Sequence, residues 1–128
     1  MKHQLTTLAL LLAAAGLASQ AAYAQEKVKI GLITDMSSLY SDVEGKGGAT
    51  AMQMAIDDFG GKVLGQPIEL MSADHQNKAD IAASKAREWI DTAGVTLLFG
   101  GTNSGTALAM AKVAEEKKRV YFNNGAGT

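Results

Sequence analysis

The residues best suited to chemistry lie in the stretch LFGGTNSGTALAM, which runs from Leu98 to Met110. An apolar run ends there in two glycines, and Thr102, Asn103 and Ser104 precede an alanine-rich pattern of helical spacing. Glycines allow a tight turn and the close approach of a ligand, and a helix start directs backbone N–H groups and partial positive charge at an anion. The stretch therefore suits a carboxylate or phosphate, and it fits equally well a loop that only caps its own helix.

Two nucleotide-binding motifs are excluded by the residues around the glycines. Gly100 and Gly105 have the spacing of G-x-x-x-x-G-K-[ST], but Thr106 and Ala107 replace the lysine and the hydroxyl residue of that motif. The glycines at 45–48 fail the G-x-G-x-x-G pattern in the same way, because a threonine stands where the third glycine belongs. A small carboxylate held by Ser104 and the neighbouring N–H groups fits these residues better than a nucleotide, and we expect no cofactor.

The sequence lacks the residue sets of an enzyme or a metal site. His75 follows Asp74 directly after a strand pattern. These two side chains are too few for a zinc site, which uses three or four ligands. We therefore expect a solvated loop here, in which Asp74 positions the backbone. No serine, histidine and aspartate can be placed as a catalytic triad, so we expect no catalytic residue, no metal ligand and no enzymatic activity.

Strand and helix patterns alternate from Val28 onward. Apolar and β-branched runs predict strands at 28–34, 68–73 and 95–99 and a fourth that begins at 120. Apolar residues at helical spacing predict a helix at 48–59, a second with a buried stripe that includes Trp89, and a third that ends near 117. Asn77 and Asp80 have the spacing of a capping box at the start of the second helix.

This alternation, with short connections, predicts an α/β fold built on a doubly wound parallel sheet with helices on both faces. Ligands of such sheets bind beyond the carboxyl ends of the strands. Three polar loops leave those ends, at 35–48, 100–104 and 123–128.

The first 24 residues, the cysteine content and the net charge indicate where the protein is located and which partners it lacks. Residues 1–24 have a basic start, an apolar stretch shorter than the roughly 20 residues that span a bilayer, and a final Ala-Tyr-Ala. We expect a signal peptide cleaved near Ala24 and a periplasmic product, with an uncleaved membrane anchor as the alternative. Cysteine is absent, which excludes disulfides and a lipid-modified cysteine. The net charge of −1 and the lack of a basic cluster exclude nucleic acid as a partner.

Several segments, in their order, resemble a known family. KIGLITDMSS follows the export signal, a helix ends in two glycines, and GQPIELMSADHQNKADIAASKAREWI comes before strands that end in FGGTNSG and NNGAGT. The set resembles the N-terminal lobe of the type I periplasmic solute-binding proteins, the leucine/isoleucine/valine-binding family of ABC importers. The resemblance extends over Lys27 to Thr128. It implies that residues 25–128 are part of the N-terminal lobe of a two-lobed protein, whose second lobe would lie outside this chain.

The resemblance also implies a set of ligand-binding residues. Members of the family close two lobes around an amino acid or a related molecule, whose carboxylate is held by a serine after the third strand and by the loop after the fourth. The matching positions here are Ser104, with Asn103 beside it, and Gly125, Ala126 and Thr128. Gly127 departs from the family pattern, so either Thr128 or the Gly127 N–H would make the contact. Tyr40, the only aromatic residue of 35–48, matches the aromatic that the family often places over the ligand.

Two functions stay open at this point. The resemblance implies a monomeric periplasmic component of an ABC importer, which binds a small carboxylate and delivers it unchanged to a membrane permease. The alternative is a ligand-sensing module of the same fold that acts on a receptor or regulatory partner. The ligand could be a branched-chain amino acid, an amide or an aromatic acid. The loop DMSSLYSDVEGKGG resembles the aromatic-acid or general-metabolite branch of the family more than the amino-acid branch.

Overall fold

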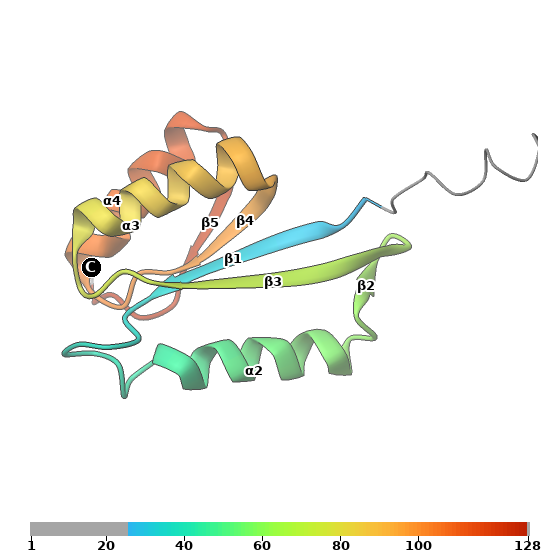
Figure 1. Cartoon of the computed structure of the whole chain (residues 1–128), viewed down its shortest axis with the longest axis horizontal. Helices are drawn as coiled ribbons and strands as arrows, with labels where there is room; N and C mark the ends of the chain where they lie inside the picture. Colours follow the sequence, from blue (N-terminus) through green and yellow to red (C-terminus); the bar gives the residue numbers. More distant parts are fainter. Residues whose placement is uncertain (1–25, 128) are drawn as a thin grey trace, which may run out of the picture.

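The computed structural model describes residues 26–127, which form a three-layer α/β arrangement (Figure 1). The sheet has five strands in the order β2-β3-β1-β4-β5. Helix α2 covers one face, and α3 and α4 lie side by side on the other. The elements are β1 (Val28–Thr34), α2 (Gly45–Asp58), β2 (Lys62–Val63), β3 (Gln66–Asp74), α3 (Ala79–Glu88), the π-helical turn η1 (Trp89–Ala93), β4 (Val95–Gly100), α4 (Ser104–Glu116) and β5 (Val120–Asn123).

The strand order confirms the predicted doubly wound parallel sheet. Strand β1 lies in the centre and pairs in parallel with β3 on one side and β4 on the other, and β5 continues from β4 in parallel. The chain moves from β1 to β3 and then crosses back to β4, so the connecting helices α2 and α3 lie on opposite faces. This reversal places a switch point between the carboxyl ends of β1 and β4, where open sheets of this type bind ligands.

The largest difference from the sequence prediction is a hairpin before β3. Strand β2 pairs antiparallel with Gln66 and Pro67, so β3 begins two residues before the predicted Ile68. Leu64 and Gly65, the two residues of the turn, have φ angles of 49° and 79°. Positive φ at both central positions is the geometry of a tight two-residue hairpin, which a leucine in the first position does not signal.

Two helix starts also differ from the prediction. Helix α2 begins at Gly45, three residues before the predicted Gly48. The prediction of a capping box at the start of α3 is wrong, because the N-cap residue of this helix is Lys78 and no side chain caps the helix. Asn77 has a left-handed backbone with φ of 57°, and its side-chain oxygen accepts a hydrogen bond from Asn103.

The hydrophobic core lies between the sheet and the two helices α3 and α4. Trp89, predicted as a core residue, is buried there and packs on Gly31 of the central strand. A Cβ at Gly31 would lie 2.8 Å from Trp89 Cε3, so the strand needs glycine beneath the indole ring. The core consists of Ile33, Ala82, Ala86, Trp89, Ile90, Val95, Leu98, Met110, Val113 and Ala114.

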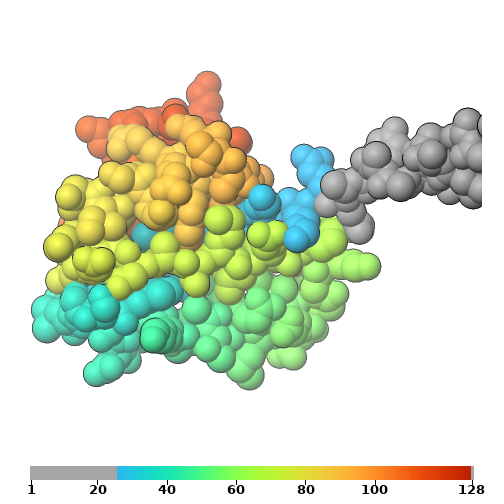
Figure 2. Space-filling view, in the orientation of Figure 1, coloured from blue at the N-terminus to red at the C-terminus, as the bar shows by residue number. Residues whose placement is uncertain are grey.

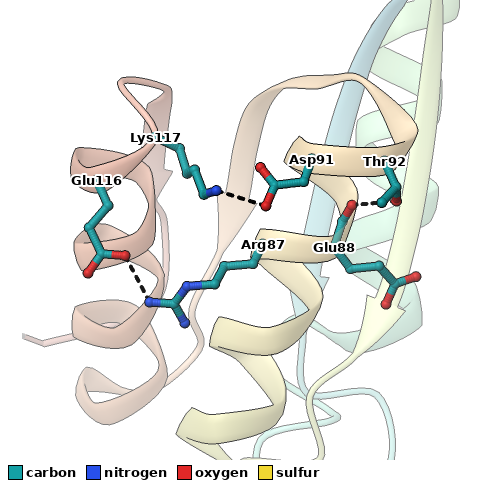
Figure 3. A network of polar contacts seen from close by, with 6 residues as sticks. All are labelled: Arg87, Glu88, Asp91, Thr92, Glu116 and Lys117. Atoms are coloured by element: carbon teal, nitrogen blue, oxygen red, sulfur yellow. Dashed lines mark hydrogen bonds and ion pairs between the residues drawn. The ribbon is translucent and has the colours of Figure 1, made fainter.

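Polar contacts join the outer sides of the same two helices (Figure 3). Arg87 of α3 pairs with Glu116 of α4 at 2.9 Å, and Lys117 pairs with Asp91 at 2.8 Å. These side chains are partly exposed to solvent, and such pairs contribute about 0–1 kcal/mol each. The buried apolar contacts therefore account for most of the association of α3 with α4.

The opposite face of the sheet is covered less completely. Helix α2 and the first loop form one layer there, the cyan to green atoms of Figure 2. Between α2 and the sheet lies an apolar groove of about 520 Å³. Phe99 at one end of the groove stacks on Phe122, with ring centroids 5.0 Å apart, and Phe122 stays half exposed. Within residues 26–127, no helix is both long enough and apolar enough to cross a membrane.

Candidate functional site

The loops after β1, β4 and β5 leave the same end of the sheet, near the C mark in Figure 1. Parallel strands place their carboxyl ends at one edge, so loops far apart in sequence meet there. The loop after β4 touches the loop after β5, because a Cβ at Gly125 would lie 3.2 Å from Thr102 Cα. Two segments that the sequence assigned to ligand binding are thus in contact.

The loop after β4 is fixed by two glycines. Gly100 and Gly101 have φ angles of 119° and 81°, which side chains other than glycine rarely adopt. A Cβ at Gly100 would lie 2.0 Å from the carbonyl oxygen of Ile33, and one at Gly101 would lie 2.3 Å from Tyr121 Oη. The Tyr121 hydroxyl donates to the Gly100 carbonyl at 2.9 Å, and burial, followed by the nearby Glu44, raises the pKa of Tyr121 to about 12. Tyr121 is therefore a neutral donor that holds the turn.

Asn103 begins α4 as its N-cap residue, in agreement with the predicted cap in this stretch. Its Oδ1 accepts a hydrogen bond from the Thr106 N–H at 3.0 Å, and its Nδ2 donates to Asn77 Oδ1. Both ends of the amide are therefore engaged in positioning the helix. Ser104 is the first residue of α4 and is half-buried. The positive end of the α4 dipole lies at this residue.

The loop after β1 is organised by the buried carboxylate of Asp35. Its oxygens accept hydrogen bonds from the Ser38 N–H at 2.8 Å, the Ser38 hydroxyl at 2.6 Å and the Tyr40 N–H at 2.9 Å. Burial alone would raise the pKa of Asp35, but these hydrogen bonds outweigh it and lower the pKa below its ordinary value. An ionised Asp35 therefore fixes the backbone that carries Tyr40.

Asp74, at the end of β3, holds the first part of the same loop. Its carboxylate accepts from the N–H groups of Met36 at 2.9 Å and Gln76 at 2.8 Å and from the Ser37 hydroxyl at 2.5 Å. Burial raises and these hydrogen bonds lower the pKa of Asp74, with a net lowering. The prediction that Asp74 positions the backbone is confirmed.

The predicted solvated environment of His75 is wrong. The side chain is 0% exposed, and its Nδ1 accepts a hydrogen bond from the Asn77 N–H at 3.0 Å. Burial lowers the pKa of His75, so the ring is neutral at pH 7 with the proton on Nε2. The Nε2 atom has no hydrogen-bond partner among the described residues. The burial of His75 was not predictable from the sequence, because the residues around it are polar and show no hydrophobic periodicity.

Glu44 connects the three loops, and sequence analysis did not single it out. Its Oε2 accepts hydrogen bonds from the hydroxyls of Thr34, at the end of β1, and Thr102, the latter at 2.9 Å. Its Oε1 accepts from the side-chain amide of Asn124, after β5. The carboxylate thus lies between segments that are up to 80 residues apart. This role of Glu44 depends on the tertiary structure, which brings the carboxyl ends of the strands together.

The structure brings together the loops that carry some of the predicted ligand residues. Thr102, which precedes Asn103 and Ser104, contacts Gly125, and the N–H groups of Gly125 and Ala126 donate to Asn123 Oδ1 at 3.3 and 3.0 Å. Tyr40 belongs to the first loop, which Glu44 joins to the other two. Thr128 lies outside the described residues. A hollow of about 630 Å³ beside the first loop is lined by residues of 36–51 alone, Glu44 among them.

No group of three or more histidine, cysteine, aspartate or glutamate side chains within 26–127 could hold a metal ion. The site instead combines a helix start, hydroxyls, amides and backbone N–H groups at the switch point of an open α/β sheet. Sites of this composition suit a small anionic or zwitterionic solute. The fold and the site define a lobe of the kind that binds small solutes.

The comparisons with known proteins agree with this class. A family model described as periplasmic binding protein matches residues 27–128, and the chain belongs to that family. The family consists of solute-binding proteins, and the structural neighbours confirm the resemblance to binding proteins of branched-chain amino acid ABC transporters. No curated protein gave a match.

Solved structures with the same fold include two from Burkholderia. A periplasmic binding protein from Burkholderia mallei is 68% identical, with a TM-score of 0.77, over 79% of this chain and 27% of that one. A branched-chain amino acid ABC transporter periplasmic ligand-binding protein from Burkholderia xenovorans LB400 is 51% identical, with a TM-score of 0.77, over 80% of this chain and 27% of that one. This chain therefore spans about a quarter of their length.

A third structure holds an aromatic acid. The solute-binding protein of an ABC transporter from Rhodopseudomonas palustris BisB5, in complex with 3,4-dihydroxybenzoic acid, is 28% identical. The match has a TM-score of 0.75 and covers 80% of this chain and 28% of that one.

Proposed function

We propose that this chain supplies one side of the binding site of a periplasmic solute-binding protein of an ABC importer. The protein would bind an amino acid or a related small carboxylate and deliver it, unchanged, to a membrane permease. The observation that carries the proposal is the contact of Gly125 with Thr102, which joins the two loops expected to hold a ligand carboxylate. Cleavage near Ala24, periplasmic location and a monomeric state belong to the same proposal.

The contacts around these loops suit a carboxylate. The start of α4 presents Ser104 together with the positive end of the helix dipole. On the neighbouring loop, the N–H groups of Gly125 and Ala126 converge on one oxygen, Asn123 Oδ1. A ligand oxygen in that position would accept from the same two groups, in competition with the asparagine. Tyr40 would contact the rest of the ligand from the first loop.

The names of similar proteins narrow the ligands to be tested. The Burkholderia xenovorans relative is described as a branched-chain amino acid transporter component, and the Rhodopseudomonas palustris structure contains a dihydroxybenzoate. Both ligand classes carry a carboxylate on a compact, partly apolar body. Such a molecule matches a site with polar groups at one end and an aromatic ring nearby.

Binding can be tested with the full-length protein by thermal shift and calorimetry. The ligands are leucine, isoleucine, valine, phenylalanine, benzoate and 3,4-dihydroxybenzoate, and each bound ligand is recovered and checked for chemical change. We expect at least one to raise Tm and to be recovered intact. If none of them shifts Tm, the proposed ligand class is wrong, and a changed product would mean an enzyme.

Ser104→Ala tests the site itself. Loss of a hydrogen bond to a charged group costs about 1.5–3 kcal/mol, so the Kd should rise by about tenfold or more. Ser84→Ala, which changes an exposed serine on α3, is the matched control and should leave the Kd unchanged. Equal affinities of the two variants would remove Ser104 from the site.

A further inference from the structure

Glu44 contributes a carboxylate at the place where the loops of the proposed site meet. Its three hydrogen-bond donors belong to Thr34, Thr102 and Asn124, one from each of the strand ends that border the site. Thr102 is two residues before Ser104, and Asn124 directly precedes Gly125. The carboxylate therefore lies between the two segments proposed to hold the ligand.

The partners of Glu44 are all electrically neutral. The ion pairs among the described residues involve other acids: Lys27–Glu69, Lys85–Glu88, Arg87–Glu116 and Lys117–Asp91. Hydroxyl and amide donors stabilise a carboxylate in place without cancelling its charge. Because Glu44 is partly buried, solvent and salt screen its field less than they screen an exposed acid.

The other acids near this edge differ from Glu44. The carboxylates of Asp35 and Asp74 accept hydrogen bonds from residues of the first loop and from Gln76, whereas that of Glu44 accepts from Thr102 and Asn124. Asp35 contacts Thr102 through its backbone N–H, which donates to the Thr102 hydroxyl at 3.3 Å. Asp42 and Lys46 line the same hollow as Glu44 but are exposed, so water screens both. Glu44 is the acid that directly bridges the two proposed ligand loops.

We propose that Glu44 is a specificity-determining residue of this site, which favours solutes with a cationic group beside the carboxylate over solutes whose only charge is the carboxylate. The inference rests on the proposed function. Two carboxylates in one partly buried site repel each other, and an ammonium group on the ligand offsets this repulsion. The same carboxylate that joins the loops thus sets the net charge of the preferred solute.

The experiment uses ligand pairs that differ only in the ammonium group: leucine against 4-methylpentanoate, and phenylalanine against 3-phenylpropanoate. The Kd of each is measured by calorimetry at low ionic strength for the full-length protein and for Glu44→Gln. The glutamine amide can still accept from Asn124 and donate to a threonine hydroxyl, so the variant removes the charge but retains partners for the loops. Asp42→Asn removes one negative charge from the same loop and is the matched control.

We expect the wild-type protein to bind the amino acid of at least one pair on the order of tenfold more tightly than its partner acid. Glu44→Gln should reduce this ratio by about tenfold, whereas Asp42→Asn should leave it within twofold. An unchanged ratio in Glu44→Gln, with binding intact, overturns the inference and leaves the proposed function standing. Wild-type protein that binds both members of each pair equally also overturns it, even if the variant does not fold. Absence of binding to all four compounds overturns the inference, and the proposed function is then decided by the six ligands of the thermal-shift test.

Discussion

The layer between the sheet and helices α3 and α4 differs in kind from the loops at the carboxyl ends of the strands. The first region is held by apolar side chains such as Leu98 and Met110, which are fully buried. The second is held by three carboxylates, Asp35, Glu44 and Asp74, which accept hydrogen bonds from backbone N–H groups, hydroxyls and an amide. One region derives its stability from buried area, and the other from directional bonds to a few acids.

The difference shows how a binding site can be added to a stable layer. Apolar packing is non-directional and tolerates small displacements, whereas each hydrogen bond to Asp35 or Asp74 fixes one backbone group. The loops that approach the ligand therefore have a defined shape although they contain few buried apolar residues. Substitutions in the two regions should affect different observables, the free energy of unfolding in one and loop order or affinity in the other.

Gly100, where the two regions meet, should give the largest effect. A Cβ there would overlap the Ile33 carbonyl, and φ of 119° is strained for alanine. We expect Gly100→Ala to lower the free energy of unfolding by more than about 4 kcal/mol, measured by urea denaturation. Gly47→Ala is the control, because nothing lies within 4 Å of its added Cβ, and it should be neutral or stabilise α2 by up to about 1 kcal/mol. Similar free energies for the two variants would contradict this account of the turn.

Leu98 tests the apolar region by itself. The side chain is 0% exposed, and truncation leaves a cavity between β4 and the helices. Leu98→Ala should cost about 2–5 kcal/mol in the same assay, with little change in ligand Kd. Leu108→Ala, at a position that is 61% exposed on α4, should stay within about 0.5 kcal/mol of wild type. A tenfold loss of affinity in Leu98→Ala would mean that the two regions are not separable.

Sequence patterns predicted the apolar region better than the polar one. The strand at 28–34 follows from a continuous apolar and β-branched run, and its last four residues are buried one after another. The stripe that includes Trp89 follows from helical periodicity, because burial on one face repeats along the chain. The parallel order of the sheet followed from the alternation of strands and helices. The sequence also predicted a helix cap within 102–104, since capping depends on residues only a few positions apart, and the structure assigns it to Asn103.

The polar region depends on contacts that no local pattern encodes. Glu44 meets Asn124 across 80 positions of sequence, and His75 is fully buried although it lies in a polar stretch. The hairpin before β3 was missed because Leu64 occupies a turn position that usually carries asparagine or glycine. Of the proposed ligand residues, Ser104 and Gly125 came from a family resemblance, and the contact between their two loops, Thr102 with Gly125, became visible only in the fold.

Asp35 tests the polar region through the order of the first loop. Asp35→Ala leaves the N–H groups of Ser38 and Tyr40 without their acceptor, which should cost about 1–3 kcal/mol. The clearer signal is faster amide hydrogen exchange at these two residues, while exchange in α4 stays slow. Asp35→Asn retains an acceptor and should fall between wild type and the alanine variant. Unchanged exchange at Ser38 and Tyr40 in Asp35→Ala would show that the carboxylate does not organise the loop.

His75 should give the smallest effect, and one that depends on pH. Burial holds the pKa of His75 in the folded protein below its ordinary value of 6.5, so the unfolded chain binds more protons as the pH falls through 6.5. The stability that the neutral ring contributes is complete above pH 6.5 and decreases below it, towards the folded pKa. His75→Asn keeps an acceptor near the Asn77 N–H but cannot take up a proton in this range. Urea midpoints at pH 7.5, 6.5 and 5.5 should therefore fall more steeply for the wild-type protein than for His75→Asn. All other titrating groups are common to both proteins, so parallel curves would mean that His75 does not resist protonation and that the polar region contributes its stability through the carboxylates alone.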